Sequence, residues 1–198
     1  MHAGIRQRFK EDILKRPLII AIAAVSGGGK TTIINLLNKK FENSVALYFD
    51  DYDFEGPDDL VEWVHRGADH NEWKLSPLIN DLKATVDNTI TRYDYIFLDY
   101  PFSYLNKGMN EFIDLTIFID TPLDVAMVRR ILRDFGNSTP EEIMFEMQSY
   151  LSGARKAYLA MLNTVKPNSD IVIDGTQEKE EIVEQIKLII KNHVKVVH

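Results

Sequence analysis

The sequence predicts an α/β fold in which one parallel β-sheet lies between two layers of helices, a three-layer sandwich. Short apolar runs alternate along the chain with stretches of helical periodicity, and this order places a helix between successive parallel strands. The 198 residues contain no internal repeat and suit one domain with a small lid. The five expected strands are the apolar runs 18–25, 45–49, 95–98, 115–119 and 171–173.

The first expected strand, 18–25, is an unbroken apolar run, which is typical of a strand buried on both faces. A glycine-rich loop follows it directly. Glycine lets backbone N–H groups turn inward around phosphate oxygens, and the positive end of the next helix then points at the anion. The loop therefore predicts binding of a nucleotide by Ser26, Gly27, Gly28, Gly29, Lys30, Thr31 and Thr32. ATP with Mg²⁺ is the expected ligand, and the sequence leaves another triphosphate open.

Two residues of this loop have specific expected roles. Lys30 supplies a compact positive charge for the phosphates, and Thr31 supplies a hydroxyl for Mg²⁺. Ala24 stands where the usual motif, G-x-x-x-x-G-K-S/T, has its first glycine, so the match is one residue short. The alternative interpretation is a glycine-rich turn that only packs a helix against the sheet.

Helical periodicity also extends to the start of the chain. Ile5, Phe9 and Ile13 predict a short amphipathic helix packed on the domain. Acidic residues interrupt the basic ones in this segment and it has no long apolar run, so we do not expect a secretory signal. The other expected helices are 31–41, 76–91, 123–135, 140–165 and 179–192.

Composition limits the partners. The formal net charge of -7 weighs against broad electrostatic binding of nucleic acid, although a local basic pocket is compatible with it. No apolar run is long enough to cross a membrane, and the absence of cysteine excludes disulfides and thiol chemistry and is compatible with the cytoplasm. We expect a small-molecule acceptor as partner, with no nucleic acid and no membrane. The sequence leaves the oligomeric state open, a homo-oligomer included.

Aspartates directly follow the expected strands after the first. The carboxyl ends of parallel strands meet at one edge of a sheet, which is where ligands bind in such folds. The glycine-rich loop leaves the first strand at the same edge, so Lys30 and Thr31 are expected near two of these aspartates. The four strand-end residues are Asp50, Asp99, Asp120 and Asp174.

Asp99 and Asp50 are the candidate functional carboxylates. We expect Asp99 to bind Mg²⁺ together with Thr31, and a helix N-cap is the alternative role. Asp50 is the candidate base that orients or deprotonates the acceptor, with Asp51 as a lesser partner. Paired carboxylates at a strand end are costly unless a cation or ligand uses them, but residues 51–58 also suit a turn.

A run of basic residues lies in the expected helix 123–135. The spacing of Arg129, Arg130 and Arg133 places Arg133 on one face with either of the other two, and this face is expected to close over the triphosphate as a catalytic clamp. The alternative is a solvated basic helix end, because arginine near a helix C-terminus also suits the dipole.

Three segments resemble the uridine kinase and nicotinamide riboside kinase group of P-loop small-molecule kinases. They are the loop 26–32, the segment 49–52, and the strand and helix that span 114–134. In that group the first aspartate of the second segment acts as base toward the sugar hydroxyl. Asp50 corresponds to this aspartate in the present sequence. The arginines of the third segment clamp the ATP phosphates. The resemblance extends from about residue 18 to residue 190.

The resemblance implies a P-loop NTPase fold, a substrate-binding insert at about 53–92 and a lid at about 129–140. Aromatic residues of the insert would stack on the substrate, and packing into the core is the alternative. Where the family tends to have Glu-Gly after the third strand, this chain has Asp99-Tyr100-Pro101. The residues expected to line the acceptor are Asp50, Tyr52, Trp63, Trp73 and Tyr100.

Two departures bear on the acceptor. Tyr100 and Phe102 are expected to occupy space where a nucleoside would otherwise sit. After Asp134 the chain lacks the further lid arginine that uridine kinases commonly have. The lid clamp is therefore expected to be weaker or completed by other groups.

The sequence thus predicts an ATP-dependent kinase that phosphorylates a hydroxyl of a small metabolite, and the expected acceptor is a nucleoside. A non-nucleoside acceptor is one alternative. A nucleotide-dependent binding or switch module is another, although the chain lacks an Asn-Lys-x-Asp guanine motif because residues 106–109 end in methionine.

Overall fold

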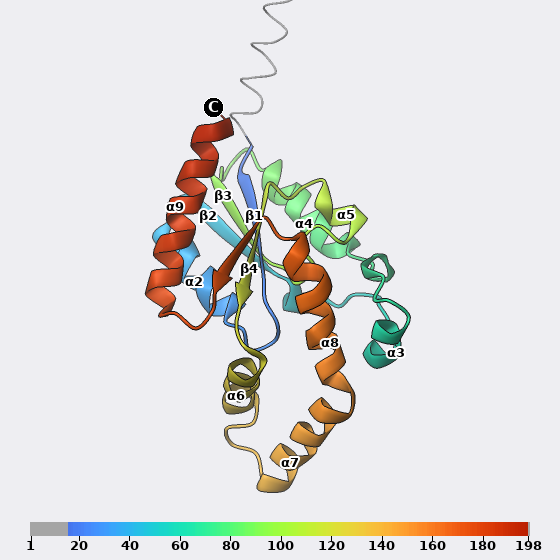
Figure 1. The fold of residues 1–198 in the computed structure, drawn as a ribbon. Coiled ribbons are helices and arrows are strands. Elements are labelled where there is room, and N and C mark those ends of the chain that lie inside the picture. Colours follow the sequence, from blue (N-terminus) through green and yellow to red (C-terminus); the bar gives the residue numbers. More distant parts are fainter. Residues whose placement is uncertain (1–15, 198) are drawn as a thin grey trace, which may run out of the picture.

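The computed structural model describes residues 16–197, which form a five-stranded parallel sheet between helices (Figure 1). The strand order is β2-β3-β1-β4-β5, so β1 is central and pairs with β3 and β4. The predicted α/β class and parallel sheet are confirmed, whereas the predicted N-terminal helix lies outside the described residues. The strands are β1 (Leu18–Ala23), β2 (Ser44–Tyr48), β3 (Tyr95–Asp99), β4 (Leu115–Asp120) and β5 (Ile171–Asp174).

The predicted helices are present with shifted ends. The expected helix 76–91 stops at Val86, and the stretch 140–165 is continuously helical, with π-helical turns at Tyr150–Ala154 and Met161–Val165. Two short helices, α3 and α5, were not predicted because six or four residues are too few to show a period. The helices are α2 (Lys30–Lys40), α3 (Leu60–His65), α4 (Ser76–Val86), α5 (Lys107–Asn110), α6 (Leu123–Asp134), α7 (Pro140–Ser149), α8 (Arg155–Ala160) and α9 (Lys179–Val197).

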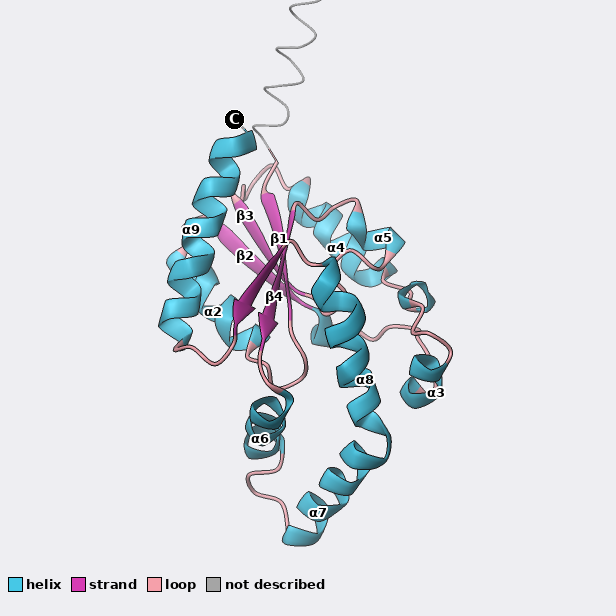
Figure 2. Cartoon of the chain, in the orientation of Figure 1, coloured by secondary structure: helices cyan, strands magenta, loops and turns pink. Residues whose placement is uncertain are grey.

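Alternating residues of the strands build two cores. Ile20 and Ile22 of β1 face the layer of α2 and α9, whereas Ile19 and Ala21 face the layer that contains α4 and α5 (Figure 2). All four side chains are buried, as expected of a central parallel strand. Because β1 is held on both faces and both edges, its carboxyl end is a fixed base for the loop that follows.

Two lobes extend from this carboxyl edge. One is formed by α6 and α7, which lie beyond the end of β4 in Figure 1. The other contains α3, which packs against the turn before α8, where a Cβ on Gly153 would lie 2.9 Å from a methyl of Val61. None of the helices within residues 16–197 is long and apolar enough to cross a membrane.

Candidate active site

The glycine-rich loop connects β1 to the first turn of α2. Gly29 is the N-cap of α2 with φ 96°, a conformation that glycine adopts without steric cost. A Cβ on Gly28 would lie 2.8 Å from the Ala24 methyl, so the missing first glycine of the motif is accommodated because Ala24 faces a glycine. No side chain caps this end of α2. Its N–H groups and positive helix end can therefore receive an anion.

A cavity of about 270 Å³ lies over this loop. The strand-end segments and the arginine helix supply the rest of its wall, so residues more than 100 positions apart meet there. The lining residues are Ala24, Val25, Ser26, Gly27, Gly29, Lys30, Thr31, Thr32, Phe49, Asp50, Pro101, Arg133 and Met161.

Lys30, Thr31 and Asp99 are in direct contact on one side of this cavity. Lys30 forms an ion pair with Asp99, and the Thr31 hydroxyl donates a hydrogen bond of 2.6 Å to the same carboxylate. Asp99 is only 2% exposed. A hydroxyl and a carboxylate held together are hard oxygen ligands of the kind that Mg²⁺ takes, so these residues fit the ion.

Burial lowers the pKa of Lys30 from 10.5 to about 8. The positive charge of Arg133 acts in the same direction, and the carboxylate of Asp50 opposes it. The ion pair with Asp99 also favours the charged form. A phosphate bound in the cavity would therefore restore the charge of a lysine that burial partly disfavours.

Asp50 lies in the 3₁₀ turn Phe49–Asp51, which directly follows β2. Its side chain is exposed and lines the cavity, and its charge interacts with both Lys30 and Arg133. The site thus holds a carboxylate free to approach an acceptor hydroxyl opposite the phosphate loop.

The three arginines of α6 have different surroundings. Arg133 lines the cavity and forms a two-pronged contact with Asp134, at 2.6 and 2.9 Å. Arg130 instead forms an ion pair of 2.7 Å with Glu146 and so joins α6 to α7. Arg129 donates a hydrogen bond of 3.2 Å to the carbonyl of Gly175. Helical spacing predicted one shared face for these arginines, but each side chain contacts a different part of the structure.

A second cavity, of about 370 Å³, lies on the other side of the glycine loop and shares Gly29 and Thr32 with the first. Arg129 and the loop after β5 complete it. The 175–179 loop was not among the residues predicted for the site. Its place after a fifth parallel strand was the available signal, because all such loops lie at the ligand edge.

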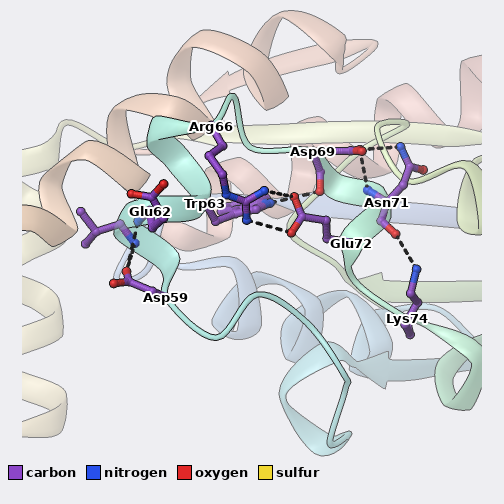
Figure 3. Close-up of polar contacts among 9 residues, drawn as sticks. Asp59, Glu62, Trp63, Arg66, Asp69, Asn71, Glu72 and Lys74 are labelled. Carbon is purple, nitrogen blue, oxygen red and sulfur yellow. Dashed lines mark hydrogen bonds and ion pairs between the residues drawn. The ribbon is translucent and has the colours of Figure 1, made fainter.

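The predicted aromatic acceptor residues are not among the lining residues of the first cavity. Tyr100 belongs to a buried cluster, and the partly buried Trp73 packs against it; both rings contact Phe49. The Tyr52 hydroxyl donates to Asp81 of α4 at 3.0 Å. The Trp63 indole donates to the Asp69 carbonyl at 3.1 Å, within the polar contacts that order the α3 lobe (Figure 3).

Comparisons with known proteins place this geometry in a family. The chain is 24% identical to the uridine kinase of Chlamydia pneumoniae, over 89% of this chain and 90% of that protein. It is 30% identical to the uridine kinase of Staphylococcus aureus strain JH9, over 85% of this chain and 93% of that protein. The chain belongs to the uridine kinase family. No protein-family model matches it.

Membership in the uridine kinase family makes this chain an ATP-dependent kinase of a small-molecule acceptor. Its fold is also seen in a gluconokinase from Sinorhizobium meliloti 1021, with a TM-score of 0.51 at 14% identity. That similarity covers 93% of this chain and 99% of the gluconokinase. The expected P-loop NTPase fold is thereby confirmed.

Proposed function

We propose that this protein transfers the γ-phosphoryl group of ATP to a hydroxyl of a nucleoside, with Mg²⁺ as cofactor. The meeting of Lys30, Asp50 and Arg133 in one cavity with the phosphate loop carries the proposal. Phosphoryl transfer needs a phosphate cradle, positive charge over the transferring group and a carboxylate at the acceptor. These three requirements are met by residues that face one space.

The glycine loop and Lys30 would hold the β- and γ-phosphates. The second cavity is the proposed site of the nucleotide base, because it adjoins the phosphate loop at Gly29 and Thr32. Thr31 and Asp99 would hold Mg²⁺, which neutralises charge on the phosphates when it is bound. Arg129 would lie beside the nucleotide in that second cavity.

On the acceptor side, Asp50 would accept the proton of the attacking hydroxyl or orient it. Arg133 and Lys30 would stabilise charge on the transferred group. Arg130, predicted as part of the same clamp, is proposed to act through Glu146 by fixing α6, which carries Arg133. Tyr52 and Trp63 stay proposed acceptor residues of the insert at about 53–92, and 129–140 stays the proposed lid.

The experiment is ADP release by the full chain with ATP and Mg²⁺, with uridine, ribose, gluconate or no acceptor. Asp50→Asn should lower kcat for the active acceptor by about 10²–10⁴-fold with the KM for ATP unchanged. Asp53→Asn is the matched control, because it removes the same charge from an exposed neighbour that does not line the cavity. Unchanged turnover in Asp50→Asn would overturn the proposal.

The panel also tests the other functions. Tyr100 and Phe102 are buried near Asp50, and their bulk favours an acceptor smaller than a nucleoside. ADP release with ribose or gluconate but not with uridine would support this second function. ADP release that is the same with no acceptor would instead indicate a nucleotide-dependent switch.

A further inference from the structure

An apolar groove of about 520 Å³ lies between α9 and the amino ends of the strands, and it is larger than either cavity beside the glycine loop. Tyr95, the first residue of β3, lines it, together with Phe41, which follows α2, and the C-terminal half of α9. Figure 1 shows this end of α9 beside the amino ends of the strands. The groove is therefore separate from the candidate active site, which lies at the carboxyl ends.

Aromatic rings and one face of α9 form the groove. The Phe41 and Tyr95 rings are half-buried and meet edge to face at a centroid distance of 4.7 Å. Beside them, helical spacing places Leu188 and Val194 on one face of α9. Leu188 is 61% exposed, whereas Ile190 is 1% exposed and joins the groove to the core. The groove is thus an apolar surface that a further apolar group can cover.

The size of the groove favours a short segment over a second copy of the chain. Eight residues line it, whereas a stable protein interface takes about 20–30 residues from each partner. Residues 1–15 of this chain precede the described part and contain the helical apolar pattern Ile5, Phe9 and Ile13. The proposed kinase function does not use this pattern.

The described chain begins beside the groove. Leu18 pairs with Tyr95 in the register of β1 and β3, and neighbouring strands lie about 4.8 Å apart. Arg16, two residues earlier, is held by an ion pair with Asp114. Three residue steps span up to about 10 Å, so Ile13 can reach the groove from this fixed point.

The N-terminal segment also matches the groove in length and charge. As a helix, residues 5–13 would extend about 12 Å, and the part of α9 that lines the groove extends about 15 Å. Entry at the C-terminal end of α9 would place Asp12 beside the exposed Lys191, and Arg6 beside the exposed Glu184. Opposite charges at both ends favour this direction of docking.

We propose that residues 5–13 of this chain dock as an amphipathic helix in the groove, with Ile5, Phe9 and Ile13 packed on Leu188 and the two rings. Burial of apolar surface drives the docking. The connection to β1 is short, so the contact forms within one chain and loop closure opposes it little. The segment thereby covers the amino edge of the core on the α9 side.

Unfolding temperatures of full-chain variants test the contact. Phe9→Ala and Leu188→Ala should each lower the unfolding temperature by about 2–4 °C, and the double variant should lose little more than either. Without a cover, Leu188→Ala would cost little, because the side chain is exposed and alanine favours a helix at least as well as leucine. Leu151→Ala is the matched control: this leucine is 74% exposed outside the groove, and its loss should leave the unfolding temperature unchanged. Additive losses, or no loss in Leu188→Ala, would overturn the proposal.

The lack of cysteine in the chain allows a direct test of proximity. Phe9→Cys combined with Leu188→Cys should form a disulfide within one chain under mild oxidation, whereas Phe9→Cys combined with Leu151→Cys should not. Equal cross-linking of both pairs, or none in the first pair, would contradict docking in the groove. A cross-linked product of twice the chain mass would show that a second copy occupies the groove, which would also overturn the proposal.

Discussion

Replacing Gly175 by alanine tests how closely the loop after β5 is fitted to the phosphate loop. A Cβ at this position would lie 2.0 Å from Thr121 Oγ1 and 2.9 Å from a methyl of Ile119, where ordinary contacts are 3.4–4 Å. Thr121 is 1% exposed and donates a hydrogen bond of 2.9 Å to the carbonyl of Gly28. The new methyl must therefore displace the residue that holds the phosphate loop.

Two costs add in this variant. Overpacking a tight core costs about 1–3 kcal/mol. Loss of the buried Thr121 hydrogen bond adds about 1–3 kcal/mol. We expect the free energy of unfolding to fall by about 2–6 kcal/mol, a large part of the 5–15 kcal/mol typical of a domain. Nucleotide affinity should fall as well, because Gly28 is displaced.

Urea unfolding followed by circular dichroism measures the free energy of unfolding. A titration with ATP measures the nucleotide affinity. Gly108→Ala is the matched control, since its Cβ would lie 3.2 Å from the flexible end of Ile79. Gly175→Ala combined with Thr121→Ala should lose less than the two single losses together, because the colliding oxygen is gone. If Gly175→Ala unfolds at the same urea concentration as wild type, the reasoning is refuted.

Two further predictions concern groups outside the phosphate loop. Burial against Trp63 and Phe102 lowers the pKa of His70 below 6.5, so the unfolded chain binds more protons as the pH falls through that value. Wild type should lose stability relative to His70→Phe between pH 7 and pH 5 in urea unfolding, and parallel pH profiles would contradict this. Arg130 and Glu146 are 2.7 Å apart, and each side chain is about one-fifth exposed. A double-mutant cycle of glutamine variants should show a coupling free energy of about 1–2 kcal/mol between them. Additive losses of stability would show that the pair does not tie α6 to α7.

Much of the fold and of the phosphate loop could be predicted because the signals are local. An apolar run such as 18–23 and a loop such as 26–32 specify a buried strand and an anion cradle from neighbours in sequence alone. The rule that parallel strands end at one edge then brought Asp50 and Asp99 toward Lys30. The structure places all three at that edge.

Other parts could not be predicted because they depend on neighbours distant in sequence. Helical spacing gives the angle between Arg129, Arg130 and Arg133 but not the partner that each side chain meets. Arg130 forms an ion pair with Glu146 of α7, whereas Arg129 donates to the Gly175 carbonyl and lines the second cavity. Only Arg133 of the three lines the first cavity.

The sequence by itself determined the parallel α/β sheet, the phosphate loop and the carboxylates at its edge, because period, glycine content and strand order are carried by short segments. The tertiary structure alone decided which residues share a cavity, why Ala24 can replace a glycine, and which aromatic donors are left unpaired. Tertiary packing determines these three features, because each depends on distances between atoms of residues that lie far apart in the chain. Trp73 and Tyr100 are the clearest case: the sequence placed both among the residues expected to line the acceptor, with packing into the core as the alternative. The structure packs both rings into one aromatic cluster and leaves the indole N–H and the hydroxyl without a hydrogen-bond partner within residues 16–197.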